Sequence, residues 1–188
     1  MLAIVLLAIS AVVVGGIINA SYRTSEFARN FVIAQNLANE GIEGVISLRN
    51  TNWLQHFGNQ GCWLVKEPSI EAFCDGGSEH AKANVNYVAT IQGGWVLIDA
   101  GVPDTTFDPL SPDPVYELYK ENYDGLDIYV DSFSASDEAE PTGFYRHVIF
   151  DSIALDNSQA TLTVTIAWSE GAKERFVERS VVLYNFEN

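Results

Sequence analysis

The chain opens with an uncharged apolar run that gives way to a helical period. Residues 1–18, MLAIVLLAISAVVVGGII, carry no charge and as a helix would span about 27 Å, close to the thickness of a bilayer core. Beyond this run apolar residues recur every three or four positions, which predicts an amphipathic helix reaching about Arg49. Its stripe consists of Phe27, Phe31, Ala34, Ala38, Ile42 and Val45.

We expect the apolar run to be retained rather than cleaved as a secretory signal. No basic residues precede it, and the amphipathic pattern follows where a mature domain would begin. The adjacent Gly15 and Gly16 weaken a helix at this point. Small residues four apart, Ala11 with Gly15 and Gly16 with Ala20, also permit close approach of a second helix.

After Trp53 the period falls toward two, which predicts strands. The linkers LDNSQ and SEGAKE make the last part of the chain, residues 144–184, a three-strand antiparallel meander. Because one long helix precedes a run of strands, the predicted class is α+β with an antiparallel sheet. The expected strands are Val85–Ile91, Trp95–Asp99, Asp127–Phe133, Phe144–Ile153, Ala160–Trp168 and Arg175–Tyr184.

Alternation in the predicted strand Ala160–Trp168 assigns its two faces. Leu162, Val164, Ile166 and Trp168 should face the helix stripe, with Thr161, Thr163, Thr165 and Ala167 opposite, as in a half-buried sheet. The proline-containing segment 101–125 is expected to be an exposed excursion with one short helix, Val115–Asn122.

Charge and motifs exclude several functions. Ten basic and 25 acidic residues give a net charge of −15, which argues against a nucleic-acid surface, because phosphates require basic contacts. No hydrolase, zinc-protease or nucleotide-binding motif occurs, and the three histidines are scattered. His147 falls within a strand pattern and is expected to be structural. We therefore predict that the protein is not an enzyme.

Two groups of residues suggest ligands, each with a structural alternative. In YDGLDIYVD, Asp124, Asp127 and Asp131 offer hard oxygens for calcium, although their spacing differs from an EF-hand and a solvated strand face explains them equally well. Exposed tryptophans could form a carbohydrate platform, whereas packing in the core is their commoner use. The four are Trp53, Trp63, Trp95 and Trp168, of which Trp63 is the expected exposed one.

The first 54 residues resemble the type IV pilins and pseudopilins, most closely the minor, pilus-modification branch. The similarity lies in LLAISAVVVGG and in ASYRTSEFARNFVIAQNLANEGIEGVISLRNTNWL, with A-x-x-L-A-x-E-G-I-E and an R-x-x-N-W exit; TVTIAW and VVLYNF near the end are less specific. The resemblance implies a pilin-like ladle, with a filament-core helix over 1–24, a head-packed helix over 25–54 and a β-rich head over 55–188.

The resemblance also implies a function. Such proteins are anchored in the inner membrane, processed by a prepilin peptidase and drawn by pilus assembly machinery into an extracellular homopolymer without a cofactor. The alternatives are a minor or tip pseudopilin that primes a secretion or DNA-uptake apparatus, and a membrane-anchored, adhesin-like binding module. The residues expected in the assembly helix are Leu2, Ile4, Leu6, Leu7, Ala11, Gly15 and Gly16, with local unwinding at the two glycines in the filament.

Two further expectations follow. The family's basic leader, glycine and glutamate-containing motif do not occur here, so we expect Met1 to be an internal methionine, and no residue is assigned as the processing site or assembly glutamate.

In an exported head, Cys62 and Cys74, with eleven residues between them, should form a disulfide. Zinc is disfavoured because no second Cys or His pair stands at ligand spacing.

Overall fold

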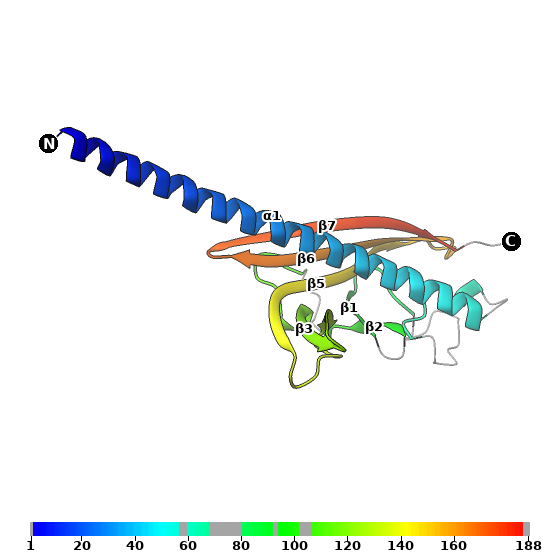
Figure 1. The fold of residues 1–188 in the computed structure, drawn as a ribbon. Coiled ribbons are helices and arrows are strands. Elements are labelled where there is room, and N and C mark those ends of the chain that lie inside the picture. The colour runs from blue at the N-terminus through cyan, green and yellow to red at the C-terminus, as the bar shows by residue number, and fades with distance from the viewer. Residues whose placement is uncertain (1, 57–59, 68–79, 92–93, 102–106, 186–188) are drawn as a thin grey trace. The chain divides into compact units, whose positions relative to one another are not determined.

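The computed structural model of the protein describes residues 2–56, 60–67, 80–91, 94–101 and 107–185, apart from the side chains of residues 2, 4–6, 8, 9, 60 and 123. Within these ranges the chain is α+β, with one long N-terminal helix and an antiparallel sheet (Figure 1). It divides into two compact units, Met1–Ile33 and Ala34–Asn188. The first unit is helix alone, and the second holds the rest of the helix and the sheet.

Helix α1 extends from Leu2 to Gln55, so the predicted helix is confirmed and ends later than expected. It contains no proline, and it remains α-helical through Gly15 and Gly16. Two threonine hydroxyls are satisfied within the helix, since Thr24 Oγ1 donates to the carbonyl of Ala20 and Thr51 Oγ1 to that of Ser47, each at 2.9 Å. The sequence therefore offers no break between its apolar and amphipathic parts.

Within the second unit, α1 buries one face against the sheet. Three members of the predicted stripe, Ala34, Ala38 and Val45, are buried, and Ile42 is half-buried. Phe27 and Phe31 fall in the first unit and are each 37% exposed. The buried face is completed by Leu37, Leu48 and Asn52.

The sheet has seven strands, and every pairing is antiparallel. Strand β5 is central: one edge pairs with β6, and the other pairs with β1 and β3 at different points along its length. The strands are β1 Asn86–Ile91, β2 Trp95–Asp99, β3 Glu117–Tyr123, β4 Leu126–Asp131, β5 Glu140–Ile153, β6 Gln159–Glu170 and β7 Lys173–Tyr184.

The predicted meander is confirmed as β5–β6–β7, but β6 is not half-buried. Val164 and Ile166 are fully buried on the face toward α1, as expected, and Thr163, Thr165 and Ala167 are buried on the other face. Thr163 hydrogen-bonds to Asp151 and Ser180 on the flanking strands. Neighbouring side chains therefore close over the short threonines, and β6 becomes a core strand on both faces.

The predicted helix Val115–Asn122 is wrong. Pro114–Tyr116 forms one 3₁₀ turn, capped by Asp113 Oδ1, which accepts from the amide of Val115 at 2.9 Å. The chain then enters β3, which pairs with β4 and β5. Asp124 and Gly125 have φ of 52° and 81°, the left-handed pair required by a two-residue hairpin turn. That hairpin outweighs the local helical pattern, and Tyr116 and Leu118 are buried rather than exposed.

Two glycines allow α1 to lie close to the sheet. A Cβ at Gly41 would stand 3.0 Å from Val164 Cγ1, and one at Gly44 would stand 2.6 Å from the Trp95 ring. Real Cβ atoms do not approach carbon at 2.6 Å, so Trp95 must shift if Gly44 gains a side chain. A glycine inside a helix lowers helix stability by about 1 kcal/mol relative to alanine. At Gly41 and Gly44 the close contact with the sheet explains why glycine is present.

We predict that Gly44→Ala lowers the free energy of unfolding by about 1–2 kcal/mol, because the clash outweighs the gain in helix propensity. Gly15→Ala is the control, since a Cβ there meets nothing within 4 Å and should leave the midpoint unchanged or raise it. Tryptophan fluorescence during urea unfolding measures both. A Gly44→Ala protein as stable as the native one would contradict the packing described here.

Candidate assembly surface

The first unit exposes an apolar helix surface. Leu7 is 73% exposed and Val12 is 76% exposed, and Ala11, Gly15 and Gly16 are exposed as well. Among the described residues, a Cβ built at either glycine would meet nothing within 4 Å, so there is space beside each of them. Three other residues expected in the assembly helix, Leu2, Ile4 and Leu6, have side chains outside the described part of the chain.

Among the residues that the structure describes, no helix is long and apolar enough to cross a membrane.

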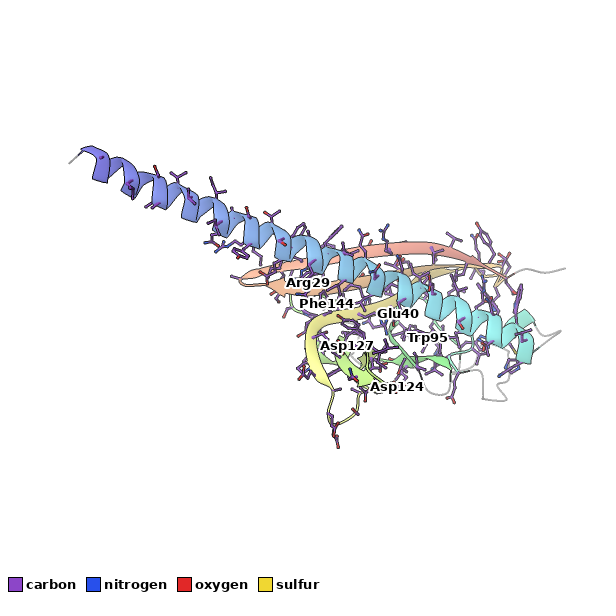
Figure 2. All side chains as sticks on the ribbon, in the orientation of Figure 1. Arg29, Glu40, Trp95, Asp124, Asp127 and Phe144 are labelled. Atoms are coloured by element: carbon purple, nitrogen blue, oxygen red, sulfur yellow. The ribbon has the colours of Figure 1, made fainter. Side chains whose placement is uncertain are left out.

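A buried arginine fixes α1 to the head. Arg146 on β5 is 2% exposed, and its Nη1 lies 3.1 Å from Glu40 Oε1 on α1. Its Nη2 donates to the carbonyl of Ala89 on β1 at 3.1 Å. The guanidinium carbon also lies 5.7 Å from the centre of the Trp95 ring on β2. The side chains of Glu40 and Trp95 are labelled in Figure 2.

The sequence pattern did not predict this cluster. Glu40, Gly41 and Gly44 belong to the quoted A-x-x-L-A-x-E-G-I-E segment and the residues after it, but Arg146 lies over a hundred residues away. The available signal was an arginine in a predicted strand rich in apolar residues, since a buried arginine requires a carboxylate partner. Three separate elements, α1, β1 and β2, thus meet around one cation.

A small cavity adjoins the cluster. Its volume is about 20 Å³, room for one water molecule. Arg146 Nε is buried and has no hydrogen-bond partner. The cavity is lined by Glu40, Ile91, Trp95, Tyr129, Val130, Asp131, Ser134 and Arg146. Its size excludes an organic ligand, so the cavity belongs to the packing of α1 on the head.

The four tryptophans all pack against parts of their own chain. Trp63 was expected to be the exposed one, and it is fully buried; Trp168 is also buried. The Trp95 ring packs against Gly44 and lies near the Arg146 guanidinium. Trp53 is half-buried and donates from Nε1 to Asn185 Oδ1 at 3.2 Å. Each of the four is engaged by its own chain.

The three aspartates proposed for calcium take different roles. Asp124, labelled with Asp127 in Figure 2, lies in the β3–β4 turn. Asp127 forms a 2.7 Å ion pair with Lys120 and also accepts from Asn122. Asp131 is buried, and its Oδ1 accepts from the amide of Phe133 at 2.9 Å. The side chains that the structure describes include no group of three or more potential ligands able to hold a metal ion.

Cys62 is buried and disulfide-bonded. Cys74 lies outside the described residues, so the pairing of these two stays a prediction. Asn52 near the end of α1 secures the neighbouring segment, because its Nδ2 donates to the carbonyls of Trp63 and Val65 at 3.3 and 2.8 Å. This buried amide joins the helix to the region of the predicted disulfide.

His147 sits in an aromatic cluster on the face of the sheet opposite α1. Its ring stacks on Phe107 at 4.5 Å and meets the edge of Tyr116 at 5.3 Å. Nε2 lies 2.8 Å from Asn86 Oδ1 on β1. Burial lowers the pKa of His147 to about 4. The pKa of Tyr116 is raised to about 12, mainly by burial and next by the negative charge of Asp113. Both rings are neutral at pH 7, and His147 anchors the excursion to the sheet.

We predict that His147 makes stability depend on pH. Its pKa falls from 6.5 in the unfolded chain to about 4 in the folded one, so its contribution is complete above pH 6.5 and is lost as the pH falls toward 4. Between pH 7 and pH 5 the free energy of unfolding should drop by about 2 kcal/mol from this group. Denaturant titrations at each pH measure this free energy, and His147→Gln should remove this part of its pH dependence. An unchanged pH dependence in His147→Gln would contradict the prediction.

No protein-family model, curated protein or solved structure matches this chain. The resemblance to type IV pilins therefore rests on the residues quoted above.

Proposed function

We propose that the chain is a structural subunit of an extracellular, type IV pilus-like filament that assembles through α1. The observation that carries the proposal is an exposed, uncharged helix surface formed by Leu7 and residues 10–18, on a helix that continues into a folded head. Contiguous apolar surface of this extent calls for a partner. Identical helices from neighbouring subunits supply one, because each exposes the same surface.

Burial of such a helix supplies a large driving force. Removing roughly 1,000 Å² of apolar surface from water is worth about 25 kcal/mol at about 25 cal/mol per Å², an upper value before the ordering cost. The heads carry the net negative charge and repel one another, but physiological salt screens this within about 8 Å. Cohesion therefore comes from the helices, and the heads adjust the lattice.

The α+β fold supports a pilin-like layout in which α1 both joins the filament and belongs to the head. Glu40, Gly41 and Gly44 attach the second part of α1 to the sheet through Arg146, Val164 and Trp95. In this proposal the apolar part is anchored in the inner membrane before assembly, and a prepilin peptidase and pilus machinery act on the protein. The chain itself carries out no reaction, and it unwinds locally at Gly15 and Gly16 once assembled.

Shaft and tip roles make different predictions for labelled filaments. A shaft subunit is labelled by gold-conjugated antibody along the filament, whereas a priming pseudopilin is labelled at one end. The membrane-anchored binding module draws no support from the tryptophans, because Trp63 and Trp168 are buried and the Trp95 ring lies against Gly44 and near the Arg146 guanidinium.

We predict that Leu7→Asp abolishes filaments, because it would place an unpaired carboxylate among apolar helices. Glu138→Lys is the matched control: Glu138 is exposed in the head, and its reversal should keep filaments and alter only their salt dependence. Negative-stain electron microscopy of cell-surface preparations measures both. Filaments unaffected by Leu7→Asp, or only membrane-bound monomers of the native chain, would overturn the proposal.

A further inference from the structure

We propose that the cavity beside Arg146 binds one ordered water molecule, which accepts a hydrogen bond from Arg146 Nε and donates one to the carboxylate of Asp131 on β4. This site goes beyond the proposed filament role and does not depend on it. The residues that line the cavity all belong to the second unit, so the site lies within one compact body.

The Arg146 guanidinium supplies the donor. Its Nη1 points to Glu40 Oε1 and its Nη2 to the carbonyl of Ala89, each at 3.1 Å. Nε is buried as well, and no atom of the described residues accepts a hydrogen bond from it. Arg146 as a whole is only 2% exposed. Because an unpaired N–H of a buried charged group is costly, an acceptor is required within hydrogen-bond distance.

The cavity supplies the room and the other polar partners. Its volume is about 20 Å³, and roughly 10–15 Å³ is enough to hold a water molecule. Asp131 and Ser134 line it together with Arg146. Asp131 is 3% exposed, and its Oδ1 accepts from the amide of Phe133, which leaves Oδ2 for the water. One donor, one carboxylate oxygen and one hydroxyl are the two to four partners that a buried water needs.

Charge selects water over an ion. A cation would lie beside the positive guanidinium and would face an N–H group, which cannot coordinate it. An anion would lie beside two carboxylates, those of Glu40 and Asp131. Water is neutral and can accept from Nε while it donates to a carboxylate. It is also the size of the cavity, so donor, acceptor and volume agree on one occupant.

The water joins one more element to the buried arginine. Arg146 contacts α1 through Glu40 and β1 through Ala89, and the water extends this connection to β4 through Asp131. The sequence suggested Asp131 as a calcium ligand. Here it is instead the second carboxylate beside the guanidinium. The β3–β4 hairpin thereby takes part in the attachment of α1 to the sheet.

The first test is a high-resolution crystal structure of the full chain in detergent. We expect one electron-density peak within hydrogen-bond distance of both Arg146 Nε and an Asp131 carboxylate oxygen. Crystals grown with bromide and crystals grown with rubidium should show no anomalous signal at that peak. An absent peak would refute the water site, and a bromide or rubidium signal would replace the water with an ion.

The second test detects the water in solution. In the ¹⁵N-labelled full chain in detergent micelles, the Arg146 Nε–H proton should give a cross-peak at the water frequency whose sign in a ROESY spectrum is opposite to the diagonal, as for a bound molecule. Arg179, exposed on β7, is the control and should show only exchange with bulk water, with the sign of the diagonal. An Arg146 signal like that of Arg179, or no cross-peak, would reject the site. Both tests use single chains in detergent, so failure of the filament proposal leaves their outcome unchanged.

Discussion

The close approach of α1 to the sheet is the constraint on which the second unit depends. Gly41 and Gly44 bring the helix backbone near Val164 and Trp95, and this leaves room for Arg146 to reach Glu40. Removing Glu40 alone would leave a buried guanidinium without its carboxylate, which is costlier than never having buried the pair. The two glycines and Arg146 therefore act together: the glycines permit the close approach of α1, and Arg146 forms the ion pair with Glu40 that this approach allows.

The same helix serves two environments because its polarity changes along its length. Before Ser21 it is uncharged, and the side chains described there are exposed; after Ile33 one face is buried in the head core. The proposed filament role uses both parts, because a subunit that joins the filament through the apolar part of α1 needs a firm connection from that part to its head. The absence of proline and the unbroken helix through Gly15 and Gly16 provide that connection in the single chain.

Periodicity predicted the elements whose patterns are local. The strands near Val85–Ile91, Trp95–Asp99 and 144–184 and the long helix are confirmed, because alternation and helical spacing report directly on which face is buried. The prediction failed at 115–122, where hydrogen bonds from β4 and β5 outweighed a weak helical pattern. It failed again at Trp63, which is fully buried and whose carbonyl accepts a hydrogen bond from Asn52 on the helix.

The sequence by itself determined the charge-free opening of α1, the acidity of the remainder and the α+β class, since composition and period are properties of short windows. Only the tertiary structure decided that Arg146 meets Glu40, and that Asp124, Asp127 and Asp131 serve a turn, an ion pair and a buried hydrogen bond. Contacts between distant residues depend on strand register and on how near a helix can lie to a sheet, and both arise only when the chain packs.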